Sequence, residues 1–128
     1  MAQQTILLDT NAFIRLVQSP DLLTKSAQTL IEQSKLLVSI ASPWEMTIKS
    51  SLGKLQLRYT VKEVLDRHRH VVSLLQISVG HLEVLQTLPH HHRDPFDRII
   101  IAQALAENLP VVSSDAAFDA YGVERLWD

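Results

Sequence analysis

The chain has 128 residues, of which 46% are hydrophobic and 20% are charged, and its formal net charge is −2. This length and composition suit one globular domain over residues 1–128 and exclude a disordered protein. It contains no cysteine, which excludes disulfides, thiolate zinc sites and cysteine nucleophiles. The polar start and the lack of an apolar run near ~20 residues predict a cytoplasmic protein with neither a signal peptide nor a membrane span.

Short apolar runs alternate with longer amphipathic stretches in the first half of the chain. Ile6–Leu8 is typical of a buried strand, and helical periodicity follows at Phe13, Ile14 and Val17. The further elements predicted here are a helix over Leu22–Ser34, a strand over Leu36–Ala41 and a helix over Ser42–Ser51.

The second half continues the alternation. Its strongest helical pattern spans Asp94–Asn108, ends before Pro110 and is followed by a strand at Val111–Ser113. The other predicted elements are a helix over Thr60–Val72, a strand over Leu74–Ser78, a helix over Val79–Leu88 and a short strand over Val123–Trp127. Strands that alternate with helices predict an α/β fold, in which a mainly parallel sheet of about four to five strands lies between layers of helices.

Four acidic residues fall where predicted strands end or where the following helices begin. Asp9 follows the first strand directly, and Asp115 follows the strand at Val111–Ser113. Glu45 and Asp97 lie in the first turns of predicted helices. Ligands of parallel sheets bind at the carboxyl ends of the strands, so these four acids are expected to share one edge of the sheet.

Helix capping offers a structural explanation for most of these acids. Ser42-Pro43-Trp44-Glu45 and Asp94-Pro95-Phe96-Asp97 both have a cap residue, a proline at the first position and an acid at the third. Asp115 fits the cap of a short helix that carries Phe118. Taken singly, each of these acids is better explained by capping. Asp9 is the exception, because Thr10 or Asn11 can cap the helix that follows it.

Taken together, the four acids favour a metal site. Carboxylates that converge on one cleft repel one another, and burial raises their pKa values. Mg²⁺ or Mn²⁺ offsets this repulsion and prefers oxygen ligands supplied by carboxylates, waters and substrate phosphates. Such an ion positions water and neutralises charge on a phosphate, which points to phosphodiester hydrolysis.

Several segments resemble the PIN domain of VapC-type toxins over about Ile6–Trp127. They are Leu7-Leu8-Asp9-Thr10-Asn11-Ala12, Pro43-Trp44-Glu45-Met46-Thr47-Ile48-Lys49, Leu52-Gly53-Lys54-Leu55, His91 through Ala104, which contains His-Arg-Asp-Pro-Phe-Asp-Arg, and Ser113-Ser114-Asp115-Ala116-Ala117-Phe118. The resemblance implies a PIN-like three-layer α/β sandwich and an endoribonuclease that depends on Mg²⁺ or Mn²⁺. It implies that Asp9, Glu45, Asp97 and Asp115 are the catalytic, metal-binding acids.

The resemblance also suggests supporting residues and partners. Asp94 matches a further family acid and is expected mainly to cap its helix, with Ser113 and Asn11 beside the metal ligands. Ser114 stands where the family commonly has a basic residue, which removes one phosphate contact. Family members are often toxins that form homodimers and are silenced by a small antitoxin protein, so an RNA substrate, a cognate antitoxin and a homodimer are the partners implied here.

Basic residues must overcome the slightly negative net charge if the substrate is RNA, because phosphate contacts dominate nucleic-acid affinity. Arg93 and Arg98 flank the acidic segment and, with Lys49, are the candidates for RNA contacts. Trp44 and Phe96 are expected in the core rather than stacked on bases.

The six histidines do not favour a zinc site. Consecutive residues point apart, so the run from His90 to His92 cannot converge on one metal, and His68 and His70 are poorly spaced on a helix. His92 is instead expected to position Asp94 or to contact the substrate.

Three other classes of protein share part of this sequence pattern. A non-catalytic PIN-like binding module would use the acidic cleft to receive a basic partner peptide, although it would not need all four acids. A phosphatase with Asp9 as nucleophile usually has a second acid two positions later, where this chain has Asn11. A flap-type DNA nuclease shares the carboxylate chemistry, but the chain is short for the helical arch that threads DNA.

Overall fold

A five-stranded, all-parallel sheet with strand order β3-β2-β1-β4-β5 forms the centre of the computed structural model, which describes residues 3–127. The strands are β1 (Thr5–Leu8), β2 (Lys35–Ser39), β3 (Val72–Leu75), β4 (Val111–Val112) and β5 (Arg125–Leu126). The predicted α/β class and parallel sheet are confirmed.

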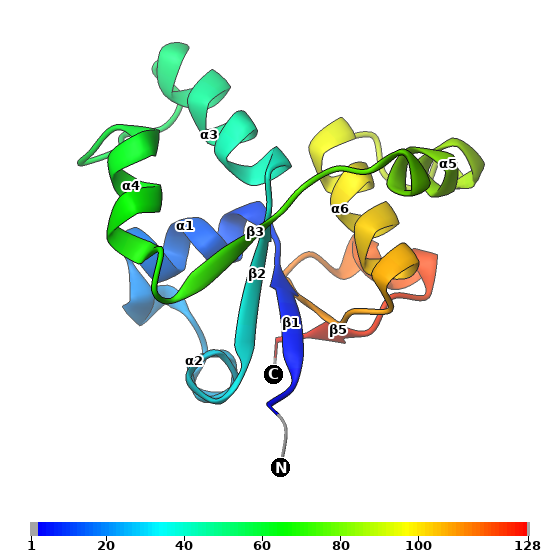
Figure 1. The fold of residues 1–128 in the computed structure, drawn as a ribbon, viewed down its shortest axis with the longest axis horizontal. Coiled ribbons are helices and arrows are strands. Elements are labelled where there is room, and N and C mark those ends of the chain that lie inside the picture. The colour runs from blue at the N-terminus through cyan, green and yellow to red at the C-terminus, as the bar shows by residue number, and fades with distance from the viewer. Residues whose placement is uncertain (1–2, 128) are drawn as a thin grey trace.

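Helices cover both faces of the sheet (Figure 1). They are α1 (Thr10–Gln18), α2 (Lys25–Gln33), α3 (Ala41–Ser51), α4 (Val61–His68), α5 (Val79–Thr87) and α6 (Pro95–Glu107), with 3₁₀ helices η1 (Pro20–Leu22) and η2 (Ala116–Tyr121). In Figure 1, α1, α2 and α4 lie on one side of the sheet and α5 and α6 on the other. Within residues 3–127, no helix is long and apolar enough to cross a lipid bilayer.

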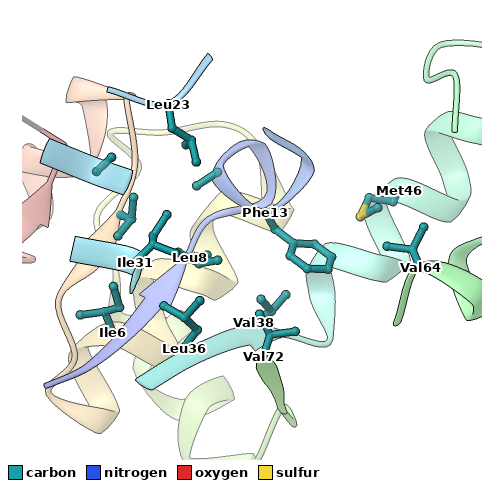
Figure 2. Close-up of a cluster of buried hydrophobic side chains, with 13 residues drawn as sticks. Ile6, Leu8, Phe13, Leu23, Ile31, Leu36, Val38, Met46, Val64 and Val72 are labelled. Atoms are coloured by element: carbon teal, nitrogen blue, oxygen red, sulfur yellow. The ribbon is translucent and has the colours of Figure 1, made fainter. Parts of the chain in front are cut away.

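The alternating side chains of β1 divide the core into two layers, as expected for a strand buried on both faces. Ile6 and Leu8 face the first layer, where Phe13 of α1 is fully buried (Figure 2). Leu7 faces the second layer and packs with Ile100 of α6. β1 therefore packs against both helical layers. Because β1 ends at Leu8, the next residue, Asp9, is held in a fixed position at the carboxyl end of the strand.

Local capping residues explain where several helices begin and end. Thr60 and Glu63 form a capping box at α4, and Ser78 caps α5. Asn108 adopts the left-handed conformation with φ 57° after α6, and Pro110 follows two residues later. The predicted end of the strongest helix is thus confirmed.

Some predicted boundaries were wrong. The helix expected over Leu22–Ser34 is divided, because Thr24 caps α2 and leaves η1 before it. The helix expected over Thr60–Val72 ends at His68, since Val72 pairs with Leu36 in the sheet. The strand therefore lies at Val72–Leu75 rather than Leu74–Ser78.

The capping box predicted at Ser42 was also wrong. α3 begins at Ala41, with Ile40 as its N-cap, so Ser42 lies inside the helix. The Ser42 hydroxyl is buried and lies 2.9 Å from the hydroxyl of Thr10. This contact between α3 and α1 depends on tertiary packing, so the local sequence pattern did not reveal it.

Candidate active site

Asp9 lies at the junction of β1 and α1 and is only 3% exposed. Its Oδ1 accepts a hydrogen bond of 2.8 Å from the amide of Ala12, so Asp9 itself caps α1, and the expectation that Thr10 or Asn11 does so was wrong. Burial raises the pKa of Asp9, and the charge of Asp115 adds to this. Hydrogen bonds from Ser113 and Ala12 act in the opposite direction by stabilising the carboxylate.

Asp97 lies in the first turn of α6, behind the cap formed by Asp94. One oxygen of Asp94 accepts hydrogen bonds from the amides of Phe96 at 2.8 Å and Asp97 at 3.2 Å, which confirms the predicted cap. Burial and the charges of Asp94, Asp9 and Glu45 together raise the pKa of Asp97 to about 7, against the opposing effect of His92. Four carboxylates from distant parts of the chain are therefore close enough to influence one another.

Asp115 follows β4 and caps η2, as expected. Its Oδ1 accepts from the amide of Ala117 at 3.0 Å, and its own amide donates to the Ser113 hydroxyl at 3.0 Å. Ser113 is fully buried, and its hydroxyl also hydrogen-bonds Asp9. The prediction that Ser113 supports the acids agrees with this geometry, because one hydroxyl links two of them.

His92 lies between two of the acids. Its Nε2 is 3.0 Å from Asp115 Oδ2 and 3.2 Å from Asp97 Oδ2. Its Nδ1 accepts a hydrogen bond of 3.1 Å from the amide of Asp94, so Nδ1 carries no hydrogen and the neutral ring carries its hydrogen on Nε2. His92 thus donates to the carboxylates and positions them. The contact of His92 with Asp94 was expected from the sequence, whereas its contacts with Asp97 and Asp115 were not.

Glu45 reaches the cluster from α3 and is 4% exposed. Its Oε2 forms an ion pair of 2.7 Å with Lys49, one helical turn later, and this contact raises the pKa of Lys49. Among the described residues, Glu45 Oε1 is buried and has no hydrogen-bond partner. A buried carboxylate oxygen without a partner is costly, so this atom suits a cation that the protein chain does not supply.

Arg98 and Tyr121 hold the loop that carries His92. The buried Arg98 guanidinium donates to the backbone carbonyls of Pro89 at 2.8 Å and Leu88 at 3.3 Å, and to the Tyr121 hydroxyl at 3.2 Å. The same hydroxyl accepts from the amide of His92 at 2.8 Å. Arg98 is therefore engaged within the protein, and its predicted contact with RNA has no support in this geometry.

The remaining predicted residues lie around the cluster. Asn11 and Arg93 are exposed, and Lys49 is paired with Glu45. The expectation that Trp44 is a core residue was wrong, because it is 57% exposed. Its ring meets the partly buried ring of Phe96 edge-on at 4.9 Å.

The histidine run diverges, as predicted. His91 packs against the ring of Tyr121 at 5.3 Å, whereas only His92 faces the acids. Among residues 3–127, one ring nitrogen of His92 and one oxygen each of Asp97 and Asp115 lie within 4.8 Å of one another. A divalent cation fits the carboxylates of this group, with His92 as the residue that orients them, since the unpartnered Glu45 oxygen and the raised pKa of Asp97 both mark a shortage of positive charge.

The protein is therefore an α/β protein with a parallel sheet, and its acidic residues gather at the carboxyl ends of the strands. The family model of the PIN domain matches residues 6–124, so the chain belongs to the PIN-domain family. No curated protein sequence matches the chain significantly.

Solved structures show the same fold at low sequence identity. A chain of the VapBC2 complex from Rickettsia felis, bound to a DNA fragment from its promoter, is 16% identical, with a TM-score of 0.73 and coverage of 98% of this chain and 100% of that one. A chain of FitAcB from Neisseria gonorrhoeae is 15% identical, with a TM-score of 0.69 and coverage of 94% and 96%. A chain of a toxin–antitoxin complex from Klebsiella pneumoniae is 18% identical, with a TM-score of 0.59 and coverage of 86% of each chain.

Proposed function

We propose that this protein is an endoribonuclease that depends on Mg²⁺ or Mn²⁺ and serves as the toxin of a toxin–antitoxin pair. The observation that carries this proposal is the gathering of carboxylates around Asp97, where the buried Oε1 of Glu45 has no hydrogen-bond partner among the described residues. Burial and the charges of Asp94, Asp9 and Glu45 raise the pKa of Asp97 to about 7, and His92 acts against this. Such crowding is unfavourable without a cation and is typical of sites that bind one.

Asp9, Asp97, Asp115 and Glu45 are the residues that would hold the ion. When bound, it would supply positive charge to the phosphate oxygens and make a water molecule more acidic. The protein prepares the ligands for this role. Ser113 links Asp9 to Asp115, and His92 donates to Asp97 or Asp115, so three carboxylates are oriented before any ion arrives.

Glu45 and Lys49 are the residues that α3 contributes to the cluster. Lys49 neutralises one oxygen of Glu45, while the other oxygen remains buried and available to a cation. Lys49 is 43% exposed at its side chain, so its ammonium group is also accessible to a phosphate of the RNA. The exposed Arg93 directly precedes Asp94 in the sequence and is the second candidate for such a contact.

The toxin role rests on family membership and on the complexes in which similar folds were solved. The Klebsiella pneumoniae structure is named as a toxin–antitoxin complex, and the Rickettsia felis structure is the VapBC2 complex bound to a DNA fragment from its promoter. We propose by analogy that a small antitoxin protein covers the acidic cluster of this chain, and that the chain forms a homodimer.

The experiment that tests the enzymatic proposal is cleavage of end-labelled single-stranded RNA by the purified protein with Mn²⁺. Asp9→Asn keeps a side chain that can cap α1 but removes the charge, so the fold is expected to survive while cleavage is lost. Asp21→Asn, at an exposed acid in η1, is the matched control and is expected to cleave normally.

Two results would contradict the proposal. Cleavage that persists in EDTA, or in Asp9→Asn, would show that the acids do not hold a required metal. A protein that takes up no Mn²⁺ at millimolar concentration in a calorimetric titration, and cleaves no RNA, would instead favour a binding module for a basic peptide.

A further inference from the structure

A cavity of about 610 Å³ opens beside the acidic cluster. Six residues line it: Leu85, His90, His92, Arg93, Pro95 and Arg98. Its volume falls within the range of about 300–1,000 Å³ that is usual for sites that bind small molecules or parts of larger ligands. Arg93 and Arg98 were predicted singly as RNA contacts, but the sequence did not indicate that they share a cavity.

The cavity and the acidic cluster share a wall. His92 lines the cavity, and the Nε2 atom of the same ring lies 3.0 Å from Asp115 and 3.2 Å from Asp97. Pro95 and Arg98 line it from the first turn of α6, on either side of Asp97 in the sequence. A ligand bound at the acids therefore has this cavity directly beside it.

The lining differs sharply in charge from the acidic cluster. It has two arginines, two histidines and no acidic side chain. Arg98 is buried and fixed by its contacts with Leu88, Pro89 and Tyr121, so its charge has a constant position. Arg93 is exposed and can reach an anion at the entrance.

The uncharged part of the lining suits a flat ring. Leu85 and Pro95 supply apolar surface, and the exposed His90 adds an aromatic ring. Bases of single-stranded nucleic acids stack on aromatic and apolar side chains, and neighbouring basic residues hold the phosphates. An acidic peptide would use the arginines but not this apolar surface.

We propose that the cavity receives one nucleotide of the RNA, next to the phosphate that is cleaved at the acidic cluster. Arg93 contacts the phosphate of that nucleotide, and its base lies against Leu85, Pro95 and His90. This assignment rests on the proposed ribonuclease function. It adds a binding site that positions the RNA relative to the carboxylates.

The test measures nucleotide binding separately from cleavage. Adenosine and uridine monophosphates, ribose 5-phosphate and inorganic phosphate are titrated in turn into ¹⁵N-labelled protein with Mg²⁺ present, and amide shifts are followed by NMR. The two nucleotides are expected to shift the amides of Leu85, His90 and Arg93 at lower concentrations than inorganic phosphate does. Arg93→Gln is expected to weaken nucleotide binding on the order of tenfold, and His90→Ala about fivefold.

Lys35→Gln is the matched control, because it removes one positive charge at the start of β2, at the opposite edge of the sheet from the acids. A second measurement uses a single-stranded RNA and the Asp9→Asn protein, so that no cleavage intervenes. There, Arg93→Gln is expected to reduce the slope of log affinity against log salt by about 0.7, the value for one phosphate contact on a single strand. Lys35→Gln should leave the slope unchanged.

Each outcome separates this inference from the proposed function. RNA cleavage by the unmodified protein, together with equal RNA binding by Arg93→Gln and Lys35→Gln, would overturn the cavity assignment and leave the ribonuclease intact. Equal shifts with inorganic phosphate and nucleotides would overturn it as well, because they would show an anion site only. Nucleotide shifts at the cavity without any RNA cleavage would support the nucleotide site and contradict the enzyme.

Discussion

His92 Nε2 lies 3.0 Å from Asp115 Oδ2, and this contact joins the loop before α6 to the segment after β4. Because the other ring nitrogen accepts from the amide of Asp94, the tautomer of His92 is determined by the backbone. The ring therefore serves as a fixed donor to the carboxylates of Asp115 and Asp97, in the way that residues around metal ligands orient those ligands.

The first prediction concerns this donor. His92→Ala is expected to lower RNA cleavage by about 10- to 100-fold, the usual effect of losing a residue that orients metal ligands. His92→Gln can donate from its amide group, so it should retain more activity than His92→Ala and bind Mn²⁺ nearly as well as the unmodified protein. Equal loss of Mn²⁺ binding in both variants, measured by calorimetry, would identify His92 as a metal ligand instead.

The second prediction concerns pH. The pKa of Asp97 is raised to about 7, whereas an unfolded aspartate has a pKa of about 4. Between these values the folded protein binds a proton that the unfolded chain does not, so the contribution of Asp97 to stability is full below about pH 4 and is lost as the pH rises through 7.

Urea unfolding in EDTA at pH 5 and pH 8 measures this effect. The free energy of unfolding should fall between the two pH values by on the order of 2–4 kcal/mol more in the unmodified protein than in Asp97→Asn, which carries no charge at either pH. Parallel changes in the two proteins would show that the pKa of Asp97 is not raised.

The third prediction concerns the pair between Lys49 and Glu45. Lys49→Met leaves a carboxylate that is 6% exposed without its cation, so the metal-free protein should lose about 1–3 kcal/mol of stability. Lys62→Met breaks a pair of similar length and spacing whose side chains are 86% and 41% exposed, and should cost about 0.5 kcal/mol or less. Mg²⁺ should reduce the difference between the variants, and equal losses in EDTA would argue against a buried pair.

The fourth prediction separates two roles for Arg98. If its guanidinium holds the loop at Leu88 and Pro89, Arg98→Lys should lower the free energy of unfolding by about 2–3 kcal/mol, because one ammonium group cannot make all of these hydrogen bonds. Arg93→Lys, at the exposed arginine, should have almost no effect on unfolding. A stable Arg98→Lys protein with weakened RNA binding would restore the role first predicted for this residue.

Much of the site could be predicted from the sequence because its signals are local. Asp94 and Asp97 lie around a proline in a pattern that specifies a helix start, and the structure has this cap. Asp9 and Asp115 could be placed because each follows a short apolar run, and parallel strands direct their carboxyl ends to one edge.

The parts of the site that could not be predicted depend on contacts between segments that are distant in the sequence. His92 meets Asp115 across 23 residues, and Ser42 meets Thr10 across 32, so neither contact has a local signal. Arg98 resembles a surface arginine in sequence, yet it is buried because three acceptors from other segments surround it. Trp44 precedes a buried acid in a helix, but its own side chain faces outward.

The most direct test of the shared metal site is anomalous diffraction from crystals of the protein grown with Mn²⁺. We predict an anomalous peak between the carboxylates of Asp9, Asp97 and Asp115, near the unpartnered oxygen of Glu45, and no such peak in Asp9→Asn crystals. A peak that persists unchanged in Asp9→Asn, or one that lies only at exposed histidines such as His90, would contradict a metal centre built from these four acids.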